Sequence, residues 1–401
     1  MQRNLFQSLL QHIDKKEFSI ITGARQTGKS TLIRQLESHC KAVQMPTLFF
    51  NLENKSLLAE FDATPLNVLP YLPDTDRRTV VFVDEVQYLK DPSNFLKLLY
   101  DEYAQKIKII ATGSSAFYLD DAFHDSLAGR KRIFRLPTCS FDEYLLLRER
   151  QDLLEDVRRI KTNEKARSLH INMLQQEWET YMLYGGYPAV ITETDRKEKT
   201  ARLAEIRDSF VKRDMLESGV QNEAAFYRLF RILASQSGNL LNVNELSLTL
   251  RIKNETVNRY ITVLRKCFHI ELVSPFYRNL RKELTKMPKV YLLDTGMLNS
   301  LLNSFQTLDQ RIDKGMIWET VCYKTLCDNY GSDEVLFWRT ADNNEVDLIL
   351  PNIENPFAIE VKYDANLIKT GKYRKFIETY PEIPLSYNYL RPFSEDFFRR
   401  N

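Results

Sequence analysis

The stretch FSIITGARQTGKSTLIRQL, residues 18–36, decides the fold of the first third of this chain. Strand-forming residues lead into a Gly-x4-Gly-Lys-Ser loop, and a run of helix formers follows. In this strand–loop–helix setting, glycines let backbone N–H groups wrap a phosphate, and the helix N-terminus adds favourable partial charge. The pattern predicts a phosphate-binding loop formed by Gly23, Ala24, Arg25, Gln26, Thr27, Gly28, Lys29, Ser30 and Thr31.

Two side chains of this loop and two acids farther along the chain suit nucleotide chemistry. Lys29 is expected to reach the β- and γ-phosphates of ATP, and the Ser30 hydroxyl to ligate Mg²⁺. A second apolar strand, in TVVFVDEVQYL (79–89), ends in Asp84 and Glu85. Carboxylates at the carboxyl end of a parallel strand face the ligand. We therefore expect Asp84 to hold the Mg²⁺ water shell and Glu85 to polarise the attacking water, which predicts hydrolysis as well as binding.

Further polar residues near these motifs are candidates for contacts with the phosphates. A third apolar run, KIKIIATGSSAF (106–117), ends in polar residues, among which Thr112 and Ser114 are candidate sensors of the γ-phosphate. Simple strand-end capping is the alternative interpretation. Arg25, inside the loop, and Arg130, in SLAGRKRIF, are candidates for neutralising transition-state charge, on the same subunit or on a neighbour. Solvated surface positions are the alternative for both arginines.

The alternation of strand and helix patterns predicts an α/β fold with a doubly wound parallel sheet. Its strands are expected near residues 18–22, 47–52, 80–84, 107–112 and 131–136. A chain of 401 residues is too long for one hydrophobic core, so further domains are expected to follow.

The composition is that of an ordinary globular protein, with 43% hydrophobic residues, 27% charged residues and a formal net charge of +2. Any surface that binds nucleic acid must therefore be a local patch. No apolar run approaches the roughly 20 residues needed to cross a bilayer, and the N-terminus lacks a signal-peptide pattern. The five cysteines form no CxxC pair. These features predict a cytoplasmic protein without a membrane partner.

Two different helical patterns follow the first third of the chain. Residues 138–235 are highly charged, with apolar residues three and four apart, which predicts amphipathic helices interrupted by a turn at Gly185-Gly186. Residues 239–292 show helix–turn–helix spacing followed by strand-like runs, as in a winged helix. One face of the second helix is expected to carry the apolar residues Val257, Ile261, Leu264 and Phe268.

Polar and basic residues gather on this second helix and on the hairpin after it, as in proteins that contact a phosphate backbone. They are Asn254, Thr256, Asn258, Arg259, Arg265 and Lys266 on the helix, and Arg278, Arg281, Lys282, Lys286 and Lys289 on the hairpin. The pattern favours DNA as a partner. A winged helix that packs against protein is the alternative.

The stretch EVDLILPNIENPFAIEVK, residues 345–362, predicts a hairpin with acids at positions that favour hydrophobic residues. If the hairpin is symmetric about residues 353–354, Asp347 lies directly opposite Glu360, and Lys362 shares the Glu360 face. Opposed like charges are destabilising unless positive charge lies between them, and carboxylates suit Mg²⁺ or Mn²⁺. The pattern predicts a second divalent metal, with Lys362 positioning a hydrolytic water. A solvated edge hairpin is the alternative.

A set of motifs that spans almost the whole chain resembles the prokaryotic AAA+-type ATPases that carry a C-terminal domain of uncharacterised function. The motifs are GARQTGKST, VVFVDEVQYL, IIATGSSA, LAGR, SFDEYL, GGYP, VYLLDTGML, WRTADNNEVDLIL and AIEVK. The resemblance implies an ATPase domain (1–137), a helical lid or linker (138–235), a winged helix (236–292) and a restriction-endonuclease-like domain (293–401). Relatives of this type often work as rings, and a monomer is equally compatible with the sequence.

The C-terminal stretch also resembles the PD-(D/E)xK nuclease motif, with Val346 in place of the motif's proline. This resemblance assigns Asp347, Glu360 and Lys362 to catalysis and adds Glu319, on the preceding helix, as a metal ligand. Two functions follow. The first is an ATP-hydrolysing protein whose winged helix and nuclease-like domain act on DNA. The second is a nucleotide-switched scaffold that binds DNA or protein and cuts nothing.

Overall fold

The computed structural model describes residues 3–113, 127–163, 165–277, 286–393 and 398. The chain divides into two compact units, one made of residues 1–137 with 266–268 and the other of residues 138–265 with 269–401. Among the described residues, no helix is both long and apolar enough to cross a membrane.

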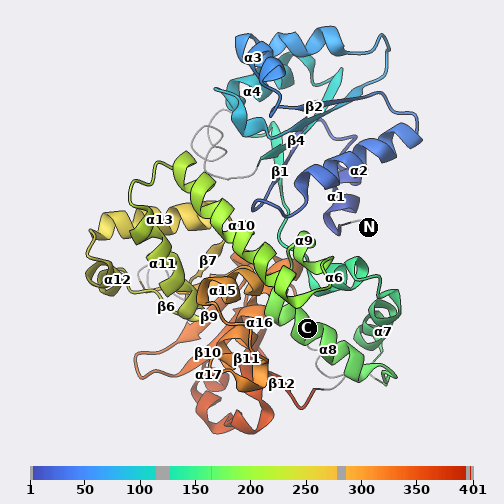
Figure 1. Ribbon diagram of the computed structural model, residues 1–401. Coiled ribbons are helices and arrows are strands. Elements are labelled where there is room, and N and C mark those ends of the chain that lie inside the picture. Colours follow the sequence, from blue (N-terminus) through green and yellow to red (C-terminus); the bar gives the residue numbers. More distant parts are fainter. Residues whose placement is uncertain (1–2, 114–126, 164, 278–285, 394–397, 399–401) are drawn as a thin grey trace. The chain divides into compact units, whose positions relative to one another are not determined.

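The first unit is a five-stranded parallel sheet in the order β2-β3-β4-β1-β5, with helices on both faces (Figure 1). The predicted α/β fold is confirmed, and each predicted strand boundary lies within one residue of the observed one. The strands are β1 (Phe18–Thr22), β2 (Thr47–Asn51), β3 (Thr79–Asp84), β4 (Ile107–Gly113) and β5 (Lys131–Arg135). The helices are α1 (Leu5–Gln11), α2 (Lys29–Ala42), α3 (Lys55–Ala63) and α4 (Pro92–Tyr103).

Both faces of this sheet are buried, which explains the unbroken apolar runs of its strands. Along β3, Val81 and Val83 belong to the core that also contains residues of α3 and α4. Val80 and Phe82 point to the opposite face and belong to the core shared with α1 and α2. Because neither face is free, polar side chains gather where the strands end.

The second unit begins with a series of helices. They are α6 (Phe141–Leu147), α7 (Gln151–Thr162), α8 (Ile171–Tyr184), α9 (Pro188–Ile191), α10 (Arg196–Glu217) and α11 (Glu223–Ser235). The predicted turn at Gly185-Gly186 ends α8, and Gly185 has a φ of 72°. The turn is closely packed: a Cβ on Gly186 would lie 2.3 Å from the Cys139 carbonyl oxygen, and the Gly186 amide donates to Asp294 at 2.8 Å.

The helix–turn–helix spacing is matched by α12 (Val243–Leu250) and α13 (Asn254–Lys266), which are separated by a short turn. Val257, Ile261 and Leu264 are buried as predicted. The prediction for Phe268 is wrong, because α13 ends at Lys266 and Phe268 has a φ of 61°. An antiparallel sheet in the order β6-β8-β7 adjoins these helices in sequence, with β6 (Asn239–Leu240), β7 (Ile270–Val273) and β8 (Lys289–Leu292).

The C-terminal part contains a four-stranded sheet in the order β12-β11-β10-β9. Its strands are β9 (Leu336–Arg339), β10 (Glu345–Leu350), β11 (Phe357–Asp364) and β12 (Leu385–Arg391), and its helices are α15 (Thr295–Leu302), α16 (Lys314–Tyr330) and α17 (Arg374–Thr379). Leu348 pairs with Ile359 and Leu350 with Phe357, so the β10–β11 hairpin is symmetric about residues 353–354 as predicted. On its other side, β10 shifts register against β9 between Val346 and Ile349.

Candidate functional sites

The first candidate site is the loop that joins β1 to α2 at the carboxyl edge of the parallel sheet. Gln26 and Gly28 have φ values of 62° and 93°, so the loop turns twice through the left-handed region. A Cβ on Gly23 would lie 2.2 Å from the Leu136 carbonyl oxygen, so a larger residue would displace the loop. The predicted binding residues differ in exposure: Gly23, Ala24, Thr27 and Lys29 are buried, Arg25, Gly28 and Ser30 are half-buried, and Gln26 and Thr31 are exposed.

Two cations contact carbonyl groups of this loop. Lys29 is buried, and its ammonium donates to the carbonyl oxygens of Gly23 at 2.9 Å and Ala24 at 2.8 Å. The buried Arg3 donates to the Thr27 carbonyl oxygen at 2.7 Å. No motif in the sequence points to Arg3, because it lies outside the loop pattern. The Lys29 side chain therefore folds back onto the loop, and Arg3 supports the loop from the N-terminal segment.

The two predicted acids lie at the same edge of the sheet as the loop, because β1, β4 and β3 are parallel and the acids lie at the end of β3 just as the loop follows β1. The buried Thr112, at the end of β4, donates to Asp84 and accepts from the Glu85 amide at 3.0 Å. Glu85 is half-buried with a φ of 60°, and its carboxylate accepts from Gln87. Thr112 thus holds both acidic residues in place. Ser114, the other predicted sensor, lies outside the described residues.

Arg130 lies at the opposite edge of the sheet. Lys131 pairs with Phe18, the first residue of β1, whereas the loop begins after Thr22, the last one. A strand of this length separates the two edges by about 13 Å at 3.3 Å per residue. The Arg130 guanidinium donates to Asp101 at 2.6 Å. The structure therefore does not bring Arg130 to the loop of its own subunit.

The residues at the carboxyl edge fit a nucleotide phosphate chain with Mg²⁺. The 14-residue helix α2 begins at this loop, and the first amides of a helix point out of its end towards an anion. Lys29 adds a positive charge beside them. The Ser30 hydroxyl and the Asp84 carboxylate are the hard oxygen ligands that Mg²⁺ prefers.

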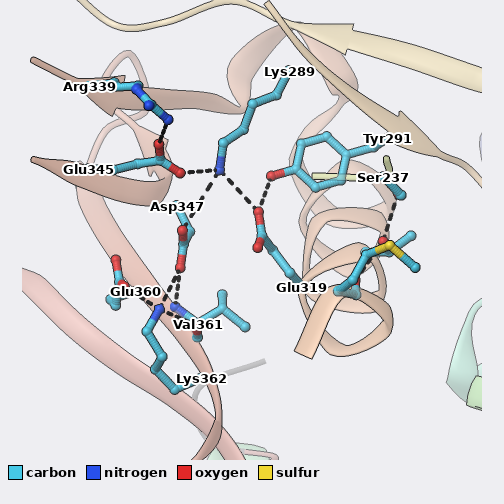
Figure 2. A network of polar contacts seen from close by, with 12 residues as sticks. Ser237, Lys289, Tyr291, Glu319, Arg339, Glu345, Asp347, Glu360, Val361 and Lys362 are labelled. Atoms are coloured by element: carbon cyan, nitrogen blue, oxygen red, sulfur yellow. Dashed lines mark hydrogen bonds and ion pairs between the residues drawn. The ribbon is translucent and has the colours of Figure 1, made fainter. Parts of the chain in front are cut away.

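The second candidate site is a network of charged side chains in the second unit (Figure 2). We call it the carboxylate cluster. It brings together the predicted residues Glu319, Asp347, Glu360 and Lys362, and adds three residues that the motif analysis did not assign to it. Its members are Lys289 from β8, Glu319 from α16, Arg339 from β9, Glu345 and Asp347 from β10, and Glu360 and Lys362 from β11.

Lys362 lies between the two acids of the hairpin. Its ammonium donates to Glu360 and lies 3.4 Å from Asp347 Oδ2. Asp347 also accepts from the Val361 amide at 2.9 Å, and Glu360 accepts from the Tyr373 hydroxyl at 2.6 Å. Asp347 and Glu360 are only 6% and 1% exposed, because β10 and β11 are the inner strands of the sheet. The alternative of a solvated edge hairpin is therefore wrong.

Lys289 lies among three carboxylates. Its ammonium nitrogen is 2.8 Å from Glu345 Oε1, 3.1 Å from Glu319 Oε1 and 3.7 Å from Asp347 Oδ1, and its side chain is 2% exposed. The prediction that Lys289 contacts DNA phosphates from a solvent-facing hairpin is wrong. The reason is that β8 is the middle strand of its sheet, and the side chain of Lys289, its first residue, points towards α16 and β10 (Figure 2).

Burial and charge shift the pKa values of this cluster. Burial, with the charge of Asp347, raises the pKa of Glu360 to about 7, although Lys362 opposes the shift. Burial raises the pKa of Glu319 to about 6, against the lowering effect of Lys289. Burial by itself would lower the pKa of Lys289, but the surrounding carboxylates outweigh it and raise that pKa. The carboxylates thus stabilise a charged lysine in their midst.

The predicted second metal does not fit this arrangement. The sequence predicts a divalent cation that supplies the positive charge between the acids. In the structure, Lys362 and Lys289 supply it. Within the part of the chain that the structure describes, there is no group of three or more His, Cys, Asp or Glu side chains placed to share a metal ion.

The proposed nucleic-acid surface is described only in part. Asn254, Asn258, Arg259, Arg265 and Lys286 are exposed, whereas Thr256 and Lys266 are half-buried; Arg278, Arg281 and Lys282 lie outside the described residues. Arg265 donates to Glu271 at 2.7 Å, so its charge is partly neutralised. Arg259 is an exposed basic residue on the open face of α13.

The first unit is similar in sequence to a family described as an AAA domain. Residues 15–145 match the family model of the AAA domain, which covers the whole parallel sheet and both of its motifs. Residues 175–308 and 314–396 match two domains of unknown function, DUF8612 and DUF4143. The matched range includes the loop after β1 and the two acids at the end of β3, so the first unit resembles an AAA domain in its sequence as well as in these motifs.

Several relatives share most of the chain. An uncharacterized protein of Mycobacterium tuberculosis is 25% identical over 86% of this chain and 69% of its own length. An uncharacterized protein of Methanocaldococcus jannaschii is 25% identical over 90% of this chain and 77% of its own length. An uncharacterized protein of Haemophilus influenzae is 24% identical over 74% of this chain and 72% of its own length.

Similar solved structures include AMPPCP-bound DnaA from Aquifex aeolicus, which is 13% identical and has a TM-score of 0.29, with 65% of this chain and 86% of that chain covered. The structure of Drosophila ORC bound to DNA is 12% identical and has a TM-score of 0.27, with coverage of 70% and 90%. These low scores carry no functional weight.

Proposed function

We propose that the first unit binds ATP with Mg²⁺ and hydrolyses it. The observation that carries this proposal is the convergence of a phosphate-binding loop, the buried Asp84 and the half-buried Glu85 at one sheet edge. Lys29 would exchange its loop carbonyls for the β- and γ-phosphates. Ser30 and Asp84 would hold Mg²⁺, which neutralises phosphate charge.

Glu85 is the residue that would accept a proton from the attacking water. A general base must be held within hydrogen-bond reach of that water. Gln87 holds the Glu85 carboxylate and Thr112 holds its amide, so the side chain starts from a defined position. The same Thr112 contact to Asp84 keeps the two acids in fixed relation.

Two substitutions test this assignment. Lys29→Ala is expected to abolish hydrolysis. Glu85→Gln is expected to lower it by about 10²–10⁴-fold without loss of ATP binding, because only proton transfer is removed. Phosphate release and binding of a fluorescent ATP analogue are measured on the same preparations. Lys41→Ala, with a side chain 61% exposed in the last turn of α2, is the matched control. A Glu85→Gln variant that hydrolyses ATP at the wild-type rate would rule out Glu85 as the general base.

Arg130 can serve hydrolysis only from a neighbouring subunit, because its own loop is at the other sheet edge. A homo-oligomer would meet this need. Light scattering after size exclusion, with and without ATP, measures the assembly. Loss of hydrolysis in Arg130→Ala, with assembly retained, would support a role in trans. Full hydrolysis by a wild-type monomer would exclude it.

For the second unit, we propose a winged-helix surface that binds DNA under nucleotide control. In support, α13 buries Val257 and Ile261 on one face and exposes Asn254, Asn258 and Arg259 on the other. A helix of this kind enters the major groove in helix–turn–helix proteins. A protein partner, including a second copy of this chain, is the alternative.

Salt dependence and nucleotide dependence test the DNA proposal together. Anisotropy of a labelled mixed-sequence duplex is measured at about 50 and 200 mM salt, since phosphate contacts weaken steeply over this range. We expect Arg259→Ala to weaken binding several-fold, and Glu85→Gln with ATP to hold one binding state. The control is Lys375→Ala, at an exposed ion pair with Asp342. Absence of DNA binding in every nucleotide state would favour the protein partner.

Of the two sequence-based functions for the C-terminal part, we favour the scaffold over the nuclease. Lys289 and Lys362 occupy the positions where a metal ion would neutralise the carboxylates. DNA is incubated with Mg²⁺ or Mn²⁺ and either wild type or Asp347→Ala. Cleavage by the wild type alone would overturn this choice.

A further inference from the structure

The carboxylate cluster has its own internal cation. Lys289 carries three ammonium hydrogens, and Glu345, Glu319 and Asp347 surround its nitrogen at 2.8, 3.1 and 3.7 Å. These are hydrogen-bond or ion-pair distances, whereas a divalent metal would lie about 2.0–2.6 Å from its oxygen ligands. A metal at this place would require the ammonium to leave.

The side-chain charges of the cluster also leave little need for an added metal cation. Lys289, Arg339 and Lys362 face the four carboxylates of Glu319, Glu345, Asp347 and Glu360. Buried charges are tolerated when they are paired, and the removal of one partner leaves the others uncompensated. A divalent ion added beside the buried Lys289 would place like charges close together.

Lys289 also joins parts of the second unit that are distant in sequence. It comes from β8, and its partners come from α16 and β10 (Figure 2). Tyr291, two residues along β8, donates to Glu319 at 2.6 Å. The Phe276 amide also donates to the Phe337 carbonyl, so the segment after β7 pairs with β9. The helix–turn–helix sheet and the C-terminal sheet are thereby tied at two places.

We propose that Lys289 is the resident cation of the carboxylate cluster, and that it clasps β8 to α16 and β10 in place of a divalent metal. Lys289 and a hydrolytic metal would occupy the same place and cannot both be present. The cluster in this chain therefore holds the second unit together and binds no metal. Removal of the lysine should convert the cluster into a divalent-cation site, because the buried Asp347 and the half-buried Glu319 and Glu345 would lose their shared cation. The proposal does not depend on ATP hydrolysis by the first unit.

Manganese binding to the full chain, measured by electron paramagnetic resonance without nucleotide, tests the proposal directly. The wild type is expected to leave Mn²⁺ in its free-ion form. Lys289→Ala is expected to bind one Mn²⁺ at least about tenfold more tightly than wild type, and Lys289→Ala with Asp347→Ala should lose that binding. Lys375→Ala, in an exposed pair, is the matched control and should behave as wild type. Asp347-dependent Mn²⁺ binding by the wild type would overturn the proposal.

Thermal unfolding provides a second readout that does not require the metal site to form. Lys289→Met keeps the aliphatic stem and should lower the melting temperature of the second unit. Lys289→Met combined with Glu319→Gln should recover part of that loss, because both charges are removed together. A melting temperature equal to wild type in Lys289→Met, or no recovery in the double variant, would contradict the clasp. ATP hydrolysis by each variant reports on the first unit separately, so a failure of the proposed ATPase remains distinguishable.

Discussion

The phosphate-binding loop and the carboxylate cluster both hold charge, but they are assembled in opposite ways. The loop is one continuous segment, and its shape comes from backbone conformation at Gln26 and Gly28 and from close packing at Gly23. The cluster draws its charged side chains from β8, α16, β9, β10 and β11. The loop can therefore be recognised from its own residues, whereas the cluster depends on which strands become neighbours.

The buried lysines of the two sites contact different kinds of group. Lys29 donates to loop carbonyls, which carry no net charge, so it can exchange them for a phosphate. Lys289 contacts three carboxylates and cannot leave without exposing uncompensated negative charge. A buried lysine thus fits ligand binding in the first unit and structural pairing in the second.

The largest expected effects come from one glycine in each unit. A Cβ on Gly23 would lie 2.2 Å from the Leu136 carbonyl oxygen, and one on Gly186 would lie 2.3 Å from the Cys139 carbonyl oxygen. Gly23→Ala is expected to abolish ATP binding without changing the unfolding of the second unit. Gly186→Ala is expected to destabilise the second unit by about 3 kcal/mol through overpacking.

Nucleotide binding and thermal unfolding of both glycine variants check this pair. If Gly186→Ala removed ATP binding while the second unit kept its wild-type stability, the separation between the two regions would be wrong.

A smaller effect is expected at Arg3, which supports the loop through the Thr27 carbonyl. Arg3→Met keeps the apolar stem but removes a charge-assisted hydrogen bond. The loss should weaken ATP binding about tenfold, the equivalent of roughly 1.4 kcal/mol. Titration with a fluorescent ATP analogue measures it, and Lys41→Met is the exposed control. Unchanged affinity would mean that the loop keeps its shape without Arg3.

A further expected effect is a pH dependence that belongs to the second unit. Burial lowers the pKa of His269 from its ordinary value of 6.5 to about 3, and its ring packs 3.7 Å from that of Phe210 between centroids. Between these pH values the unfolded chain binds a proton that the folded unit does not. Stability should thus be constant above pH 6.5 with respect to this group, and should fall as the pH decreases towards 3.

Urea unfolding at pH 7.5 and pH 5, about one unit or more to either side of the ordinary histidine pKa, measures this dependence. In His269→Leu, the stability of the second unit should depend less on pH. The pH dependence of the first unit should be unchanged, because burial and Lys108 lower the pKa of its own His12 to about 4. The same pH dependence of second-unit stability in His269→Leu and wild type would show that His269 is not its source.

The local patterns of the sequence predicted the parallel sheet closely. Apolar runs such as Val80–Val83 are long because both faces of the sheet are buried, and this property is visible without a structure. Hairpin symmetry likewise predicted the pairing of β10 with β11. Both succeed because short-range spacing alone determines which residues share a face or a register.

Sequence patterns were least informative where distant segments meet. The sequence leaves open whether Arg130 acts in its own subunit or in a neighbour, and the register of β5 against β1 places it at the sheet edge away from its own loop. Lys289 belongs to a basic run in the sequence, yet β8 directs it into the carboxylate cluster. Arg3 has no sequence signal at all. In each case the decisive contact is between residues that are far apart in the chain.

The sequence by itself determined the phosphate-binding loop, the two acids of β3 and the strands that present them, because their chemistry follows from local spacing. Only the tertiary structure decided what neutralises Asp347 and Glu360. The physical reason is that buried carboxylates require a cation, and any cation of suitable reach satisfies that requirement. Whether it is a metal ion or a lysine depends on which strand folds beside them, and here β8 supplies Lys289.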